Sequence, residues 1–363
     1  MKQILCLAGE PWSSSPGRTQ QLISRLRDTQ ILYFSPANGR SDRSFRQKGK
    51  KVRPNVTVYT LPPLLLPVEE RYSHLFRMDH RRLGRFVAEK AARHRFSAPL
   101  LWVTSPEHVH LLDHLEYGGL VYDCDREWAD LSPAWEGSLA GAADLVFAAS
   151  PQLRDRLSPC SSNIALLPNG VNYPLFSGQG ADLRPDPLPR VTGPVLGRVG
   201  TLWEDLELSP LLTAALERPD WTFVLLGREE DNPLLHRLHR LPNVIFPGPC
   251  PLSEVPDWLY RCDVLLDFLR LDRPYDDVIP SRLYEYLSTG KPVVSMLWPD
   301  QVELFPDVVY SAHSDQEFIQ CCQHAMGEAH DFVSQRRRAH ASAAAWSGRA
   351  GQVARILATA GLL

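Results

Sequence analysis

The sequence lacks the features that mark several large classes of protein. It has no run of 18 apolar residues, so it predicts no transmembrane helix. Its seven cysteines form no CxxC pair and no zinc-type spacing, and we expect reduced thiols in a cytoplasmic protein. The second half has no GxGxxG fingerprint, and no nucleic-acid module accompanies the basic residues. We therefore predict no nucleic-acid partner.

A metal site is also not predicted. His110 and His114 lie four residues apart with acidic residues nearby, which is one pattern of metal ligands. The same pattern is more typical of a solvated helix face, and we interpret it so. We expect neither a metal nor another cofactor.

What the chain does have is the length and apolar content for two full cores. It has 363 residues, of which 44% are hydrophobic. The apolar run at residues 4–8 is too short for a signal peptide and predicts a first buried strand.

Short apolar runs alternate with amphipathic segments in both halves of the chain. Such alternation predicts parallel sheets with helices on both faces. The expected strands are residues 4–8, 31–34, 56–60, 100–104, 120–123, 145–148 and 164–167, and then 195–199, 221–226, 244–246, 264–268 and 292–295. The expected helices are residues 19–27, 78–95, 206–216, 234–240, 255–260, 282–288, about 315–345 and 348–360.

Residues 168–194 separate the two halves and have the proline-rich composition of a linker. This break favours two doubly wound domains over the structural alternative, a single (β/α)₈ barrel. We expect a first domain at residues 1–178, a second at 190–345, and a final helix at 346–363 that packs on the first. Ligands of doubly wound domains bind at the carboxyl ends of the strands, so two such domains would enclose a cleft.

The net charge of −3 conceals a basic segment at residues 36–95, which has 15 Lys and Arg against five Asp and Glu. One interpretation is a solvated loop followed by a polar helix face. The other is docking of residues 40–95 to an anionic membrane surface, favoured slightly by the apolar stretch at residues 61–67 between the two basic clusters.

The most informative run covers residues 277–295 and predicts a loop, a helix and a buried strand. Pro280 and Ser281 suit a helix start, where free N–H groups favour an anion. Arg282 adds a cation with a geometry that suits phosphate. Glu285, one turn along, could accept hydrogen bonds from both hydroxyls of a ribose. Asp277 precedes the helix and could reach a sugar. A capped helix with surface charges explains the same residues about as well.

This run resembles the donor-site signature of GT-B glycosyltransferases, in the retaining group with a Glu-x7-Glu motif. The segment Arg-Leu-Tyr-Glu-Tyr-Leu-x-x-Gly-Lys-Pro-Val-Val is similar to that of teichuronic-acid and other surface-polysaccharide glycosyltransferases. Other segments resemble the same group in the same order, and they cover nearly the whole chain. These are Gly17-Arg-Thr-Gln-Gln-Leu22, Tyr122-Asp-Cys-Asp-Arg-Glu-Trp128, Ala143-Asp-Leu-Val-Phe-Ala-Ala-Ser150, Leu167-Pro-Asn-Gly-Val-Asn172, Gly200-Thr-Leu-Trp-Glu-Asp-Leu206, Arg218-Pro-Asp-Trp-Thr-Phe-Val-Leu-Leu-Gly227 and Asn243-Val-Ile-Phe-Pro-Gly248.

The resemblance implies a GT-B fold of two Rossmann-like domains facing a central cleft, with the C-terminal helix crossing back to the first domain. It implies catalytic roles for Asp277 and Arg282. The implied donor-binding residues are Arg198, Gly200, Thr201, Phe246, Gly248, Pro249, Ser281, Leu283 and Glu285. On the side of the sugar and acceptor, the implied residues are Gly9, Glu10, Arg18, Thr104, Ser105, Asp123 and Asp125.

Two departures from the group concern charge at the donor site. Asp277 stands where the first Glu of the motif is usual, so its reach is one methylene shorter. Gly200 and Thr201 replace a Gly-Arg pair, and the Lys that follows a few residues on is missing. The two usual cations for the diphosphate are therefore absent. Arg282 is the favoured replacement, because strand alternation points Arg198 away.

The implied function is transfer of a sugar, with retention, from a UDP- or GDP-sugar to a glycan or a polyprenyl-diphosphate-linked acceptor in surface polysaccharide biosynthesis. The expected location is the cytoplasm, with peripheral contact to the inner face of the membrane. Two alternatives stay open: a sugar-nucleotide epimerase, and a degenerate, non-catalytic binding or scaffold protein.

Overall fold

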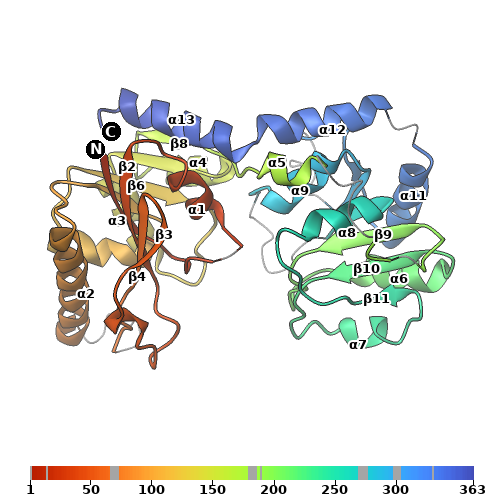
Figure 1. Cartoon of the computed structure of the whole chain (residues 1–363), viewed down its shortest axis with the longest axis horizontal. Helices are drawn as coiled ribbons and strands as arrows, with labels where there is room; N and C mark the ends of the chain where they lie inside the picture. The colour runs from red at the N-terminus through yellow and green to blue at the C-terminus, as the bar shows by residue number, and fades with distance from the viewer. Residues whose placement is uncertain are drawn as a thin grey trace. The chain divides into compact units, whose positions relative to one another are not determined.

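The chain divides into two compact units. The computed structural model describes residues 2–13, 15–65, 73–178, 186–188, 190–268, 277–296, 304–328 and 331–363. Unit 1 comprises Met1–Pro168 with Ser347–Leu363, and unit 2 comprises Asn169–Trp346. The division between Pro168 and Asn169 lies at the start of the proline-rich segment. Figure 1 shows each unit as a sheet of strands with helices around it.

Unit 1 is built on a sheet with the strand order β3-β4-β2-β1-β5-β6-β7-β8. Every pair in the described sheet is parallel except β3 with β4. Most central strands are continuous apolar runs, as burial on both faces requires. The strands are β1 (Lys2–Leu7), β2 (Thr29–Ser35), β3 (Lys50–Arg53), β4 (Val56–Thr60), β5 (Leu100–Val103), β6 (Gly119–Cys124), β7 (Leu145–Ala148) and β8 (Ile164–Leu166).

The helices of unit 1 include one that comes from the far end of the chain. Gln352 on α13 donates from Nε2 to the carbonyl oxygen of Leu166 at the end of β8, 3.3 Å away. The C-terminal helix therefore packs on the sheet formed by the first residues of the chain. The helices are α1 (Arg18–Ile23), η1 (Ser44–Arg46), α2 (Ser73–Arg93), η3 (Pro106–His114), α3 (Pro133–Ala142), α4 (Pro151–Leu157) and α13 (Trp346–Thr359).

Unit 2 has a parallel sheet with the order β11-β10-β9-β12-β13-β14. Neighbouring residues of one strand enter different cores: Val195 packs in one cluster of buried side chains and Leu196 in the other. Each face of the sheet is therefore covered, as in a doubly wound domain. The strands are β9 (Val195–Val199), β10 (Thr222–Leu226), β11 (Val244–Ile245), β12 (Val264–Asp267), β13 (Val293–Ser295) and β14 (Tyr310–Ser311).

Helix α9 is the element of unit 2 that bears most directly on the site. Pro280 occupies the N-cap position with extended backbone, and Ser281 is the first helical residue, so both residues lie at the predicted helix start. Gly290 ends the helix at φ 78°, a left-handed conformation that suits glycine. The helices of unit 2 are α5 (Tyr173–Phe176), α6 (Ser209–Glu217), α7 (Leu235–Leu238), α8 (Val255–Arg261), α9 (Ser281–Thr289), α11 (Asp315–Met326) and α12 (Asp331–Ala343).

The two parallel α/β sheets confirm the predicted fold class, and several elements differ from the prediction. Part of the basic segment forms β3, an antiparallel edge strand that pairs with β4. Its Lys and Arg side chains suit an exposed edge. The strand was not predicted, because it lacks the apolar run expected of a buried strand. The predicted elements also omitted α3, α4 and η3. In the part of the chain that the structure describes, no helix is long and apolar enough to cross a membrane.

The strand orders place one switch point in each sheet. In unit 1 the chain winds outward in opposite directions from β1 and β5, and in unit 2 from β9 and β12. Ligands of such sheets bind in the crevice at the carboxyl ends of these two strands. The candidate site residues are therefore expected at two defined places, one in each unit.

Candidate active site

The loop after β9 lies at the switch point of unit 2 and depends on two glycines. Gly200 has φ 119° and Gly227, which follows β10, has φ 157°. A Cβ on Gly227 would lie 2.1 Å from the carbonyl oxygen of Gly200, inside any allowed contact. Gly227 therefore permits the two loops to touch, which fixes the backbone of Gly200 and Thr201.

Arg198 supports this loop from within the fold. Its side chain is fully buried, with Nη1 donating to the Gly200 carbonyl at 2.9 Å and Nη2 to that of Thr201 at 3.0 Å. The proposed phosphate contact of Arg198 therefore needs correction, because its guanidinium is directed at main-chain carbonyls. Strand alternation had pointed to the same outcome.

Arg282 lies where the loop after β9 meets α9. Its Nε and Nη2 donate to Oδ1 of Asp267 at 3.1 and 2.8 Å, and its side chain is 19% exposed. A Cβ on Gly200 would lie 3.1 Å from Nη1 of Arg282, so this nitrogen faces the glycine loop. One cation is thus held at the carboxyl ends of β9 and β12.

Asp267 was missed by the sequence reasoning. It ends the buried strand β12, is nearly inaccessible, and also accepts a hydrogen bond from Ser295 Oγ at 3.2 Å. The sequence feature that could have identified it is a carboxylate directly after the apolar run Val264–Leu266, at the edge of the sheet where ligands bind. Its partner Arg282 could not be read from the sequence, since 15 positions separate them.

The first turn of α9 presents backbone donors beside Arg282. Ser281 and Arg282 are the first two helical residues, where N–H groups have no partner within a helix. The predicted role of Leu283, as part of the helix start that meets the diphosphate, stays a prediction. Its side chain is fully buried, and its N–H donates to the carbonyl oxygen of Pro280 at 3.0 Å.

Glu285 lies one turn further along α9 and is half-buried. Burial raises the pKa of its carboxyl group to about 7, and the nearby Arg282 opposes this rise. The next residue, Tyr286, fixes the helix to β9, because Val199 N–H donates to its hydroxyl oxygen at 2.8 Å. Glu285 is therefore a carboxylate with a perturbed pKa on a rigid helix beside a cation, which is typical of functional sites.

Three of the remaining predicted donor residues follow β11, at the same edge of the sheet. Phe246 follows β11 and stacks on His239, with ring centroids 3.9 Å apart and an interplanar angle of 23°. Gly248 has φ 80°, and Pro249 is exposed. Asp277 is half-buried, four residues before α9. Their contacts with a nucleotide sugar stay predictions.

In unit 1 a hydrogen bond crosses the switch point. Gly9, after β1, donates from its N–H to Oγ1 of Thr104, after β5, at 2.8 Å. A Cβ on Gly9 would lie 3.2 Å from Ser105 Cβ and 3.2 Å from the ring of Trp128. The structure thus brings Gly9, Thr104 and Ser105 together, as a shared site requires, and adds Trp128.

Arg18 and Asp123 form a buried ion pair in the same region. Nε and Nη2 of Arg18 donate to Oδ1 of Asp123 at 3.0 and 2.8 Å, and the Asp123 side chain is fully buried. The prediction that Asp123 faces an acceptor therefore needs correction. Its carboxylate instead joins the start of α1 to the end of β6.

Glu10 is exposed and Asp125 is half-buried, and Arg126 lies between these two carboxylates. Arg126 Nη2 is 3.5 Å from Glu10 Oε1, and its Nε is 3.8 Å from Asp125 Oδ1. Burial raises the pKa of Asp125 to about 6, against the attraction of Arg126. The guanidinium of Arg126 also lies over the Trp128 ring, 4.3 Å from its centroid. Sequence reasoning missed Arg126, although it lies within the quoted Tyr122–Trp128 segment.

The two sets of residues offer different chemistry. Unit 2 offers backbone donors, a held guanidinium and a carboxyl group, which suit an anion attached to a hydroxylated ring. Unit 1 offers carboxylates with an aromatic face, which suit hydroxyl groups and an apolar ring face. Among the described residues, no group of three or more His, Cys, Asp or Glu is placed to hold a metal ion.

Comparison with known sequences gives two matches. Residues 208–355, which include α9 and Glu285, match the model of a family described as glycosyl transferase-like. The chain is 28% identical over 264 residues to TuaH of Bacillus subtilis (strain 168), provisionally named a teichuronic acid biosynthesis glycosyltransferase. That alignment covers 66% of this chain and 66% of the relative, slightly under two thirds of its length.

Solved structures match over nearly the whole chain. Sucrose-phosphate synthase from Thermosynechococcus elongatus has a TM-score of 0.74 at 16% identity, covering 99% of both chains. HepE of Anabaena, in complex with UDP and glucose, has a TM-score of 0.70 at 18% identity, covering 99% of this chain and 100% of its own. Similarity at these identities shows the fold alone, which is one of two parallel-sheet α/β domains.

Proposed function

We propose that this chain, a glycosyltransferase of the GT-B type, moves a sugar from a nucleotide-diphosphate sugar to a glycan or lipid-linked acceptor, with retention, in surface polysaccharide biosynthesis. The observation that carries the proposal is the contact between Arg282 and the Gly200 loop at the β9–β12 switch point, with Glu285 one turn away. HepE binds UDP and glucose, which makes UDP-sugars the first donors to test.

The proposed chemistry is dominated by stabilisation of the leaving group. Cleavage of the bond between sugar and diphosphate develops positive charge on the sugar and negative charge on the diphosphate. The N-terminus of α9 and Nη1 of Arg282 would meet the negative charge, in a geometry fixed before the substrate binds. In the proposed retaining reaction the departing phosphate takes the acceptor proton, so no side-chain base is required.

Glu285 would hold the ribose of the donor. An ionised carboxylate can accept hydrogen bonds from two vicinal hydroxyl groups. A site built for these hydroxyl groups discriminates strongly against analogues without them. Asp277, in the segment before α9, would meet the sugar. We propose that no metal takes part, because the helix N-terminus and Arg282 supply the positive potential; chelation with EDTA would then leave turnover unchanged.

One observation favours a second candidate, a non-catalytic binding protein. Arg282 is paired with Asp267, and Arg198 is directed at carbonyls, so both cations have internal partners. Such a protein would bind a nucleotide without consuming its sugar. The epimerase alternative would instead change the sugar and return it to the nucleotide.

The test is a panel of UDP, GDP and their sugars, followed by analysis of products. We expect a nucleotide diphosphate to raise the melting temperature, and its sugar form to be hydrolysed slowly or transferred to an acceptor. Stabilisation without any turnover supports the binding protein, and an interconverted sugar supports the epimerase. No response to any nucleotide overturns the proposal.

We also propose a cytoplasmic location with contact to the inner face of the membrane. Three large apolar side chains on and beside α2 are well exposed: Leu65 and Met78 at 66%, and Leu75 at 48%. Arg81, Arg82 and Arg85 line the same groove. Apolar side chains beside arginines suit an anionic lipid surface.

A further inference from the structure

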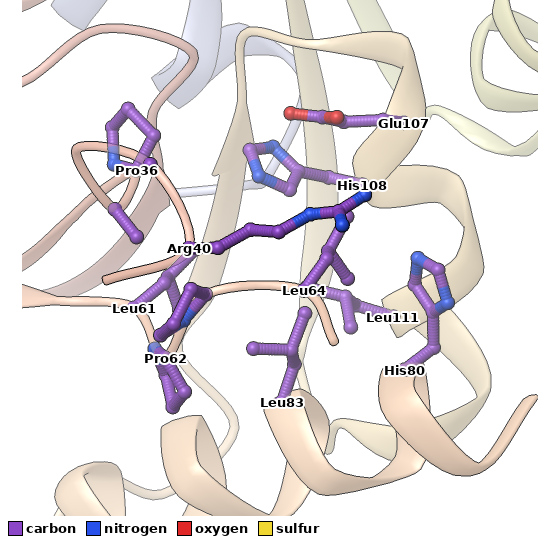
Figure 2. A pocket seen from close by; sticks show the side chains of 13 residues that line it. Pro36, Arg40, Leu61, Pro62, Leu64, His80, Leu83, Glu107, His108 and Leu111 are labelled. Atoms are coloured by element: carbon purple, nitrogen blue, oxygen red, sulfur yellow. The ribbon is translucent and has the colours of Figure 1, made fainter. Parts of the chain in front are cut away.

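Unit 1 contains a cavity that none of the predicted donor or acceptor residues lines. Its volume is about 330 Å³, at the lower end of the range for small-molecule sites. Figure 2 shows it between the segments that follow β2 and β4, helix α2 and η3. The lining residues come from these four parts: Pro36, Ala37, Gly39, Arg40, Leu61, Pro62, Pro63, Leu64, His80, Leu83, Glu107, His108 and Leu111.

Most of the cavity wall is apolar. Leu61, Leu83 and Leu111 belong to the core and are at most 6% exposed, so their positions are fixed by packing. Three prolines stiffen the segments after β2 and β4. Such a rigid wall can bind an apolar group without the entropy cost of ordering its own side chains and loops.

His108 contributes a buried polar group to this wall. It is 5% exposed, and its Nδ1 has no hydrogen-bond partner within the described residues. Burial lowers the pKa of the imidazole, which is therefore neutral near pH 7 and can donate one hydrogen bond. Its backbone N–H donates to Ser105 O at 3.1 Å, which fixes the start of η3. A buried nitrogen without a partner calls for an explanation, and a ligand that supplies a hydrogen bond would account for it.

Arg40 and Glu107 complete the polar end of the cavity. Arg40 is exposed and forms no ion pair within the residues that the structure describes. Arg40 and His108 line the same cavity, and in Figure 2 the Arg40 side chain extends toward η3, with Glu107 above it in the view and Leu83 and Pro62 below. The cavity therefore has one polar end with a cation and one apolar end.

The cavity adjoins the residues that sequence reasoning assigned to the acceptor. Ser105, which lies beside Gly9, is followed directly by η3 and its His108. At the other wall, Ser35 accepts a hydrogen bond from Trp12 N–H at 3.0 Å and is followed by Pro36. A ligand in the cavity could thus extend toward the β1–β5 switch point.

We propose that this cavity binds a lipid phosphate, with the first part of its apolar chain between Leu61, Leu83 and Leu111 and its phosphate at Arg40 and His108. This inference rests on the proposed function, for which it would name the class of the acceptor. Glu107 would accept a hydroxyl group of a sugar attached to that phosphate.

A lipid fits these observations better than a free sugar does. A sugar needs several polar partners, whereas the wall offers mainly leucine and proline. Pro62 lines both this cavity and the groove that holds exposed Leu65 and Met78. The chain of a lipid could therefore leave the cavity along an apolar path beside the arginines of α2.

The test is titration of the full chain with dodecyl phosphate below its micelle concentration. We expect saturable binding of dodecyl phosphate. Dodecanol lacks the phosphate and inorganic phosphate lacks the apolar chain, so both should bind much more weakly. Arg40→Gln should weaken binding about tenfold, the usual effect of one charge-assisted hydrogen bond. The matched control is Arg43→Gln, which removes an exposed arginine outside the cavity and should leave binding unchanged.

Two further variants make the test sharper. Ala37→Trp places a large side chain in the cavity from a surface segment and should abolish binding. Glu107→Gln removes the one acidic side chain of the described lining and should tighten binding of the phosphate. Equal binding by wild type and Ala37→Trp, or no binding by wild type, overturns the proposal. UDP binding is measured on the same samples, so failure at this cavity is distinguished from failure of the donor site in unit 2.

Discussion

Asp267 at the end of β12 holds Arg282 at the start of α9 through two hydrogen bonds to one carboxylate oxygen, at 3.1 and 2.8 Å. The pair joins the strand edge to the helix and orients the guanidinium toward Gly200. It also neutralises part of the charge that a diphosphate would meet. The proposed donor site thus gains a fixed geometry and loses some positive potential.

Arg282→Ala should reduce both stability and turnover. Asp267 would remain as a buried carboxylate without its cation, which costs up to about 3–5 kcal/mol in the free energy of unfolding. Loss of one leaving-group donor should reduce kcat about 10²–10³-fold, with a smaller effect on donor binding. Urea unfolding and initial rates measure the two effects.

A double variant separates the two roles of Arg282. Asp267→Asn combined with Arg282→Ala removes both charges and should recover much of the stability, while turnover stays low. Recovery of turnover together with stability would mean that Arg282 acts only through the fold.

The pKa of Glu285, raised from 4.5 to about 7, predicts a pH dependence of stability. Between these values the native state binds a proton that the unfolded state has lost, so stability falls as pH rises through the window. The slope due to one group is at most about 1.4 kcal/mol per pH unit. Glu285→Gln should remove this component, and Glu217→Gln, at an exposed position, should not.

Donor binding should change in the opposite direction over the same range. Ribose hydroxyls donate to the ionised carboxylate, so affinity for the nucleotide should rise as pH increases through about 7. Isothermal titration of wild type and Glu285→Gln at several pH values measures this. A nucleotide affinity that is flat with pH and unaffected by the substitution would contradict the ribose role.

Gly227→Ala should destabilise unit 2 and disturb the loop after β9. The added Cβ would meet the carbonyl oxygen of Gly200 at 2.1 Å, and backbone cannot give way as a flexible side chain can. We expect a loss of about 1–3 kcal/mol or more, together with weaker nucleotide binding. Gly348→Ala is the matched control, because its Cβ would meet nothing within 4 Å on helix α13. It should stabilise by about 0.5–1 kcal/mol.

Arg18→Ala should be among the more destabilising single substitutions in unit 1. It leaves the fully buried carboxylate of Asp123 without its cation, at a cost of about 3–5 kcal/mol. The control is Arg93→Ala, which breaks the exposed pair with Glu89 and should cost about 0.3–0.5 kcal/mol. Similar losses in the two variants would mean that the Arg18 pair is not the anchor of α1.

Helix α2 should bind anionic vesicles through its exposed arginines. Arg77, Arg81 and Arg85 recur every four residues and are exposed, so they share one face. Replacing all three by Gln should weaken binding to phosphatidylglycerol vesicles about a hundredfold, at roughly 1 kcal/mol for each charge.

Sedimentation with vesicles measures this, and pure phosphatidylcholine should bind little. A control replaces three exposed arginines outside α2, which are Arg154, Arg240 and Arg355. Equal loss in both triple variants would indicate a general charge effect, and no binding by wild type would contradict the membrane contact.

Sequence alone located the elements of the proposed donor site, because the patterns that predict them are local. Helix α9 lies within one residue of the predicted helix 282–288 at each end, and the apolar runs at β4, β7 and β9 match the observed strands at both ends. Glu285 and Arg282 follow from their spacing on that helix. The basic edge strand β3 was missed, because its pattern reflects solvent on one side instead of a buried core.

Only the tertiary structure decided which charged side chains point toward a ligand. Asp267 and Arg282 meet because β12 and α9 are adjacent in space. Asp123 pairs with Arg18 because β6 and the start of α1 are adjacent in the same way. The sequence determined that this chain forms two doubly wound sheets, with a helix that bears Arg282 and Glu285. The fold determined the pairing of its charges, since a side chain's partner depends on contacts between elements far apart in the chain.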